Sequence, residues 1–256
     1  MADGSAATGG AATGVVTGVV TGAVAGLDAA GRPGPAAEAR PGVLVGLALE
    51  ARLLRPFGDR VLVEAGAVSP AGTRAALDRL LANGATALLS FGLAAGLDPR
   101  LRPGTLLVPG SVLVGETVHR VDPALHRRLG DGVGHPLLHS DGLIADPGSK
   151  ARLFAATGCA ALDMESGYLA AFAADRGLPF AVLRAVCDPA ERCLPPAAML
   201  PLCEGGRIDG WRIARSLLGR PRQIPALMAL GRDASVARRA LSERVQHVAG
   251  AGFLAA

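Results

Sequence analysis

Two stretches decide the fold: Ala161-Leu-Asp-Met-Glu-Ser-Gly-Tyr168 and Phe180-Ala-Val-Leu-Arg-Ala-Val-Cys-Asp188. With the segment between them, they predict a buried strand, a helix and a second buried strand. Asp163 and Glu165 follow the first strand, and Asp188 follows the second. Ligands of open α/β sheets bind at the carboxyl ends of strands, so these carboxyl groups predict a binding site. The alternative for Asp163 is a helix cap.

The same alternation of apolar runs and capped helices continues outward along the chain. Ser69 followed by Pro70 is typical of a helix start, and Gly177 is typical of a helix end. We expect helices at 70–82, 147–157 and 166–176, and strands at 43–48, 61–63, 86–91, 105–108, 112–118, 160–162 and 180–186. This pattern predicts an α/β fold, a single-domain three-layer structure with a central mixed sheet.

Residues 1–40 differ from the rest of the chain in composition. Repeated units beginning at Thr13, Thr17 and Thr21 place glycine at every fourth position, which disfavours a stable helix in water. A secretion signal requires basic residues before its apolar run, and none precedes these repeats. The apolar run is also short for a membrane span. We therefore expect a disordered low-complexity extension over 1–40 and one domain over 41–256.

Basic charge is concentrated in the C-terminal part of this domain. Residues 211–247 contain eight Arg against Asp233 and Glu243, and are predicted to be helical with interruptions at Pro221 and Pro225. Such a segment can meet anionic lipid, nucleic acid or only solvent. The sequence has no interleaved aromatic residues and no nucleic-acid motif, so nucleic acid is not an expected partner.

The four cysteines, Cys159, Cys187, Cys193 and Cys203, show neither a Cys-x-x-Cys pair nor the spacing of a zinc site. Cys159 and Cys187 lie in apolar runs and are expected to be buried small residues. Nothing indicates a disulfide framework, which favours a reducing cytoplasmic environment. We expect no metal and no cofactor.

Four segments in order carry a family resemblance. Val43-Leu-Val-Gly-Leu-Ala-Leu-Glu50 is an apolar run followed by an acidic residue, and Ser90-Phe-Gly-Leu-Ala-Ala-Gly-Leu97 is glycine-rich and precedes the apolar run of 101–109. The other two contain the pairs Met164-Glu165 and Cys187-Asp188. Together they resemble the nucleoside phosphorylase and nucleosidase superfamily, which includes purine nucleoside phosphorylases and methylthioadenosine/adenosylhomocysteine nucleosidases.

The resemblance implies cleavage of the N-glycosidic bond of a purine nucleoside, with Asp188 and Glu50 as catalytic residues. Asp188 would protonate the leaving base, since burial beside apolar residues raises the pKa of a carboxyl; its alternative is a helix cap or turn. Glu50 would activate water, and its alternative is a first-turn helix glutamate. Glu165 would accept hydrogen bonds from the ribose hydroxyls.

Further substrate contacts are implied around the sugar. Met164 would pack on the ribose, although Met is also a common core residue. Gly92 allows the backbone to approach the ligand, and Leu93 and Ala94 belong to the same predicted contact. Leu93 stands where the family often has a Ser or Thr that holds phosphate or water. We therefore expect hydrolysis. The alternative is phosphorolysis by a true phosphorylase, and only then would phosphate be a co-substrate.

The base pocket is expected to be less aromatic than in the family, because Leu143, next to Ile144, replaces a purine-stacking Phe. A narrower resemblance is carried by Cys187-Asp-Pro-Ala-Glu-Arg-Cys-Leu-Pro-Pro-Ala-Ala198 and the Arg-rich tail. It is to the hopanoid-associated phosphorylases, which are implicated in removing adenine from adenosylhopane. It implies a lipid-linked nucleoside substrate and peripheral membrane contact. We also expect a homo-oligomer, and a non-catalytic nucleoside-binding protein is a further alternative.

Overall fold

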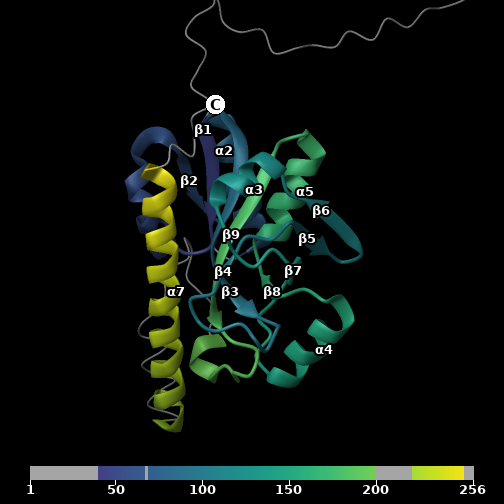
Figure 1. Ribbon diagram of the computed structural model, residues 1–256, viewed down its shortest axis with the longest axis vertical. Coiled ribbons are helices and arrows are strands. Elements are labelled where there is room, and N and C mark those ends of the chain that lie inside the picture. Colours follow the sequence, from purple (N-terminus) through teal and green to yellow (C-terminus); the bar gives the residue numbers. More distant parts are fainter. Residues whose placement is uncertain (1–39, 67–68, 200–220, 251–256) are drawn as a thin grey trace, which may run out of the picture. The chain divides into compact units, whose positions relative to one another are not determined.

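The computed structural model describes residues 40–66, 69–199 and 221–250, all in the unit from Ala39 to Ala256 (Figure 1). The extension predicted over 1–40 lies outside the described residues, except for Arg40. The first part of the predicted C-terminal helical region, 211–220, also lies outside them.

The described residues form one nine-stranded mixed sheet. Its strands are β1 (Arg40–Val45), β2 (Leu62–Ala65), β3 (Ala85–Gly96), β4 (Leu106–Leu107), β5 (Ser111–Val114), β6 (Thr117–Arg120), β7 (Leu137–His139), β8 (Ala161–Asp163) and β9 (Phe180–Asp188). The order across the sheet is β2-β1-β3-β8-β7-β5-β6, and β9 pairs with β3 and β4. Parallel and antiparallel pairs both occur, which confirms the predicted α/β fold with a central mixed sheet.

Local capping signals set the ends of the helices. Ser69 Oγ accepts the backbone N–H of Gly72 at 3.1 Å, and Asp146 Oδ1 accepts that of Ser149 at 2.7 Å. The three predicted helices were placed correctly. The described helices are α1 (Ala48–Ala51), α2 (Pro70–Ala82), α3 (Pro123–Leu129), α4 (Pro147–Thr157), α5 (Ser166–Arg176) and α7 (Ile224–Gly250), with 3-10 helices η1 (Arg52–Arg60), η2 (Pro196–Met199) and η3 (Pro221–Gln223).

Different helices cover the two faces of the central strands, which gives the predicted three layers (Figure 1). Neighbouring residues of β1 show the division: Leu44 packs in a core cluster with residues of α2 and α5, whereas Val43 and Val45 pack with residues of η1 and α7. Because side chains alternate along a strand, a continuously apolar run serves both faces.

The parallel strands β1, β3 and β9 bring three distant segments together. β1 and β9 both pair with β3 in parallel, so the carboxyl ends of these strands point in the same direction. The segment leading to Glu50 follows β1, and Asp188 ends β9. Candidate site residues far apart in sequence therefore gather at one end of the central strands.

Three local expectations were wrong. The single strand expected at 112–118 is the hairpin of β5 and β6, which turns at Gly115, whose φ is 58°. The strand expected at 86–91 continues to Gly96 as β3, because β9 pairs with it as far as Ala95. Pro225 does not interrupt a helix but lies in the first turn of α7, where its missing N–H costs no hydrogen bond.

Candidate functional site

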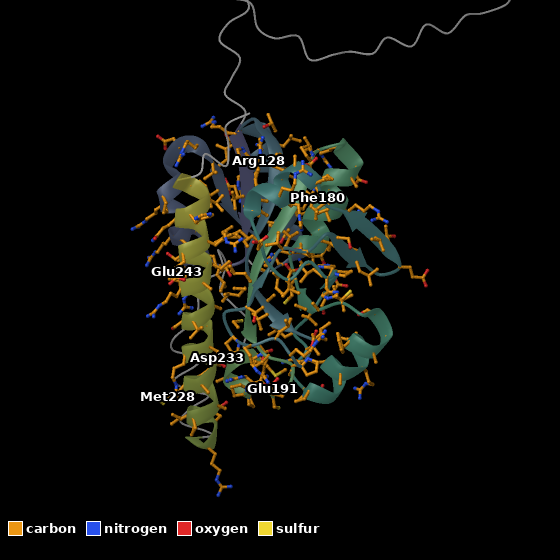
Figure 2. All side chains as sticks on the ribbon, viewed as in Figure 1. Arg128, Phe180, Glu191, Met228, Asp233 and Glu243 are labelled. Carbon is orange, nitrogen blue, oxygen red and sulfur yellow. The ribbon has the colours of Figure 1, made fainter. Side chains whose placement is uncertain are left out.

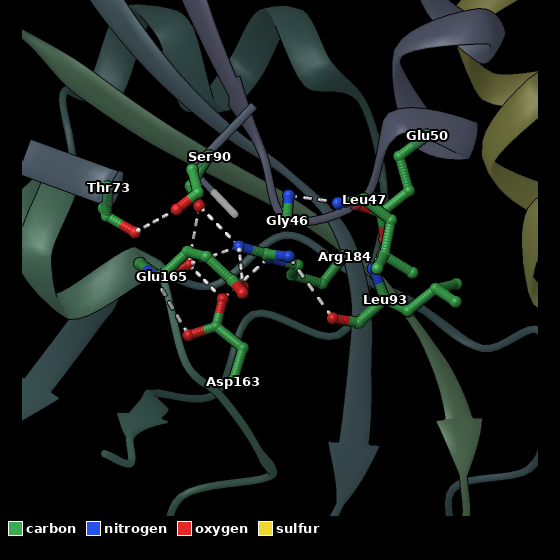
Figure 3. Close-up of polar contacts among 11 residues, drawn as sticks. Gly46, Leu47, Glu50, Thr73, Ser90, Leu93, Asp163, Glu165 and Arg184 are labelled. Carbon is green, nitrogen blue, oxygen red and sulfur yellow. Dashed lines mark hydrogen bonds and ion pairs between the residues drawn. The ribbon is translucent and has the colours of Figure 1, made fainter. Parts of the chain in front are cut away.

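Arg184, which is buried in β9, lies at the centre of the polar cluster drawn in Figure 3. Its guanidinium forms ion pairs with two carboxylates, with Nε 2.7 Å from Asp163 Oδ2 and Nη2 3.2 Å from Glu165 Oε2. Nη2 also donates to Ser90 Oγ at 2.7 Å, and Nη1 donates to the backbone oxygen of Leu93 at 3.3 Å. A buried charge needs such partners, so Arg184 holds β3, β8 and the start of α5 in a fixed arrangement.

Asp163 has two roles in the structure. Its Oδ1 accepts the backbone N–H of Ser166 at 3.1 Å, at the start of α5. Its Oδ2 accepts the hydroxyl of Ser166 and faces Arg184. The capping interpretation and the site interpretation are therefore compatible for this residue.

Glu50 lies in a cradle of backbone N–H groups (Figure 3). Its Oε2 accepts from Gly46 at 3.0 Å and from Leu47 at 2.8 Å, and its Oε1 accepts from Leu93 at 2.9 Å. Gly46 and Leu47 follow β1, whereas Leu93 lies in β3. Hydrogen bonds of this kind are stronger when the acceptor is ionised, so the cradle favours the carboxylate form of a buried Glu.

Two glycines allow the charged groups to approach the backbone. A Cβ on Gly92 would lie 2.6 Å from both Arg184 Nη1 and Glu50 Oε1, and the φ of Gly92 is 152°, a value that side chains disfavour. A Cβ on Gly46 would lie 2.8 Å from Glu165 Oε1. A side chain at the predicted position Gly92 would therefore be strained, and one at Gly46, which the sequence did not single out, would require the Glu165 carboxyl to shift.

A second charged pair lies farther along β9. Asp188 is buried and its Oδ2 lies 2.7 Å from Nζ of Lys150, a fully buried residue of α4. Asp188 comes four residues after Arg184, which corresponds to about 13 Å along a strand. The two charged centres therefore lie at different levels of the same strand, β9.

Burial changes the acidity of the three candidate carboxyls. It raises the pKa of Glu165 to about 7, with Arg184 opposing the rise and the nearby carboxylates adding to it. Burial also raises the pKa of Glu50, against the charge of Arg184 and the three N–H donors. Asp188 likewise has a raised pKa because of burial, with Lys150 opposing. For Asp188, a raised pKa keeps the proton closer to neutral pH, as general acid catalysis requires.

The other predicted contacts are less closely connected to this cluster. Met164 is half-buried beside Glu165, and the side chain of Ala94 packs in the main core cluster, so only the backbone of Ala94 can meet a ligand. Ile144 packs against a small apolar cluster, whereas Leu143 is 51 % exposed. Their contacts with substrate remain predictions.

Arg184 and Lys150 are the residues that sequence reasoning missed. An arginine inside the apolar run Phe180–Cys187 is a signal for a buried ion pair, since burial of a lone charge is costly. Lys150 is the only lysine among 26 basic residues. Composition alone does not explain why a single lysine is present in an arginine-rich chain. The structure shows that this lysine pairs with Asp188.

Neither a metal site nor a membrane-spanning helix is found within the residues that the structure describes. Among these residues, no group of His, Cys, Asp and Glu is arranged to hold a metal ion. No helix in the described ranges has the length and apolar character needed to cross a membrane. A surface groove lined by 118–122, 173–174 and 177–180 lies at the amino end of β9, away from the carboxylates.

Comparison with known proteins supports the resemblance for part of the chain. Residues 133–198 match the family model of the Phosphorylase superfamily. This segment includes Asp163, Glu165, Arg184 and Asp188 but not Glu50. No curated protein matches the chain in sequence.

Solved structures share the fold over most of the described domain. A 5'-methylthioadenosine/S-adenosylhomocysteine nucleosidase from Helicobacter pylori, with butyl-thio-DADMe-Immucillin-A, is 15% identical, with a TM-score of 0.59 over 83% of this chain and 100% of that chain. The futalosine hydrolase of the same organism is also 15% identical, with a TM-score of 0.59 over 82% and 98%. A nucleosidase from Colwellia psychrerythraea in complex with adenine is 16% identical, with a TM-score of 0.56 over 71% and 95%. At these identities the likeness concerns the fold.

Proposed function

We propose that this protein is a nucleosidase of the phosphorylase superfamily that hydrolyses the N-glycosidic bond of a purine nucleoside. The observation that carries the proposal is the pairing of two polar centres on β9. Glu50 and Glu165 gather around Arg184, and Asp188 lies four residues farther along the strand. The first centre suits a sugar and a water molecule, and the second suits a base.

The proposed reaction assigns one step to each carboxyl. Water attacks C1′ of the ribose while Glu50 takes its proton, and the bond from C1′ to N9 breaks with its electron pair going to the purine. Asp188 gives its proton to N7 of the departing base. Glu165 accepts hydrogen bonds from the ribose hydroxyls. The products are the free purine and the free sugar, and proton exchange with solvent restores both catalytic carboxyls.

The position of Glu50 favours hydrolysis over phosphorolysis. Backbone N–H groups that converge on one point form a common site for phosphate. Here the three converging N–H groups of Gly46, Leu47 and Leu93 already bind the carboxylate of Glu50. A phosphate dianion would have to displace this carboxylate and would lie beside further negative charge. Arg184 already pairs with two carboxylates, and Arg52 is exposed.

Product analysis in phosphate-free buffer tests this proposal. We expect the dialysed protein to release free adenine and free sugar from adenosine-type nucleosides, at a rate that added phosphate does not raise. Strict dependence on phosphate, with formation of a ribose 1-phosphate ester, would contradict hydrolysis. Tight binding of the nucleoside without turnover would instead favour a non-catalytic binding protein.

As the finer substrate we propose adenosylhopane, cleaved to adenine in the synthesis of hopanoid lipids. The support is the sequence resemblance of 187–198 together with exposed apolar side chains. Leu143 and Met199 are about half-exposed, and Ile224 and Met228 of α7 are exposed one turn apart. Arg222 and Arg232 flank this pair. Exposed apolar side chains with arginines nearby in the sequence suit contact with an anionic bilayer.

Competition between substrates tests the finer proposal. Adenosylhopane in anionic vesicles should be cleaved with a higher kcat/KM than methylthioadenosine. The double variant Ile224→Ser/Met228→Ser should lose vesicle binding while it keeps activity on a small nucleoside. Equal preference for methylthioadenosine, or no vesicle binding by the parent protein, would contradict it. The proposed homo-oligomer is measured by sedimentation in the same samples.

A further inference from the structure

Lys150 is the buried cation of the second charged centre, and the proposed reaction gives it no role. It is the only lysine in the chain, and it is fully buried in α4, three residues after the helix begins at Pro147. Burial of an ammonium group is costly unless its donors are all used. Its partners therefore indicate what the residue does.

The ammonium group of Lys150 uses all three of its donors on one short segment. Nζ lies 2.7 Å from Asp188 Oδ2, 3.0 Å from the backbone oxygen of Pro189 and 3.1 Å from that of Arg192. It therefore fixes both the carboxyl group and the loop that follows it. The other carboxyl oxygen, Asp188 Oδ1, is buried and has no hydrogen-bond partner within the described part of the chain.

We propose that Lys150 is a positioning residue for this reaction, which holds Asp188 by Oδ2 and so leaves Oδ1 as the edge that meets the leaving purine. The inference rests on the proposed function. A carboxyl held by one oxygen cannot rotate freely, and general acid catalysis requires the proton to lie within hydrogen-bond reach of N7. The unpartnered Oδ1 is then satisfied when the base is bound.

The charge of Lys150 also affects the pH at which Asp188 keeps its proton. Burial raises the pKa of Asp188, the charges of Lys150 and Arg192 lower it, and Asp233 raises it. Arg192 pairs with Asp233 of α7, which is labelled in Figure 2, so these two charges oppose each other. Removal of the Lys150 charge should therefore raise the pKa of Asp188 further. The carboxyl would then remain protonated to a higher pH.

Three variants test this role by kinetics. Lys150→Met removes the charge and keeps the length, Lys150→Arg keeps the charge, and Arg152→Met removes an exposed charge from the same helix as a control. For Lys150→Met we expect kcat to fall at least tenfold with a smaller change in KM. The alkaline limb of kcat/KM should move to higher pH, because the charge that lowers the pKa of Asp188 is gone. Lys150→Arg should keep the limb in place, and Arg152→Met should behave as the parent.

A spectroscopic measurement keeps the test decisive if Lys150→Met does not fold. Because the chain has one lysine, ¹⁵N-lysine labelling gives a single side-chain Nζ signal in the intact protein. That signal should shift with the titration of Asp188, on addition of adenine, and in Asp188→Asn. If Lys150→Met folds, a fall in kcat without a shift of the alkaline limb of kcat/KM would overturn the proposal. An Nζ signal that does not respond to the titration, to adenine or to Asp188→Asn would also overturn it.

The role of Lys150 and the proposed function can be contradicted separately. An active parent protein whose Lys150→Met variant keeps the parental pH profile would overturn the role of Lys150 alone. A parent protein that cleaves no purine nucleoside would overturn the proposed function and, with it, the role of Lys150 in that reaction.

Discussion

The carboxylate of Glu50 accepts the backbone N–H of Leu93 at 2.9 Å, across 43 residues of sequence. This hydrogen bond joins the segment after β1 to β3, and it completes the cradle formed by Gly46 and Leu47. The Glu50 carboxylate therefore occupies three backbone N–H donors that could otherwise bind an external anion.

Removal of the Glu50 carboxylate should create an anion site. In Glu50→Ala the three N–H donors lose their acceptor, so we expect phosphate or sulfate to raise the Tm of the variant. The parent protein should show no such effect. Thermal unfolding with sodium phosphate, against sodium chloride at equal ionic strength, measures the difference. An equal response of both proteins would show that the cradle does not select anions.

Gly92→Ala should impair both stability and activity. The added Cβ would lie 2.6 Å from Arg184 Nη1 and Glu50 Oε1 at a φ of 152°. Backbone strain of this kind costs about 1–3 kcal/mol, and the displaced groups would add to it. Gly142→Ala is the matched control, since nothing lies within 4 Å of its Cβ. Denaturant unfolding of both variants checks the prediction, which fails if they are equally stable.

Asp188→Asn should keep the fold and lower turnover by at least about a hundredfold, the usual contribution of general acid catalysis. The amide cannot deliver a proton to N7 of the base. Asp175→Asn, at an exposed position of α5, is the control. Steady-state rates and circular dichroism of the two variants test this. Parental turnover in Asp188→Asn would remove the residue from the mechanism.

Arg184→Met should destabilise the protein by about 3–5 kcal/mol, because it leaves buried carboxylates without their cation. The affected partners are Asp163 and Glu165. Arg74→Met breaks an exposed pair with Asp78 and should cost less than about 1 kcal/mol. Urea unfolding of the two variants measures the contrast, and similar losses would show that the Arg184 cluster is not needed for stability.

Stability should depend on the protonation of Glu165. Its pKa is about 7 in the folded protein against an ordinary 4.5, so the folded state binds the proton more tightly. Protonation of Glu165 therefore adds to the free energy of unfolding. This stabilisation is complete below about pH 4.5 and is lost as pH rises through about 7, at about 1.4 kcal/mol per unit of pKa difference. Glu165→Gln should therefore show a weaker loss of unfolding free energy between pH 5 and pH 8. An exposed control, Glu243→Gln, should keep the parental slope.

The sequence by itself determined the layers and the ends of three helices. The helices at 70–82, 147–157 and 166–176 were predicted correctly because their caps act within three residues of the helix ends. The division between β5 and β6 was missed because the apolar pattern runs through Val114, whereas the turn depends on Gly115. The strand-end position of Asp188 was predicted correctly, because a continuous apolar run that ends at an acidic residue is a local signal for the end of a buried strand.

Only the tertiary structure decided how the charged residues pair. Arg184 meets Asp163 and Glu165, and Lys150 meets Asp188, through ion pairs that join separate elements. No local pattern specifies these partners, because they depend on the register of β3 against β9 and on the packing of α4. A shift by one residue would turn each side chain of a strand to the opposite face. The sequence thus supplied the acidic and basic residues, and the packing of the sheet chose which of them meet.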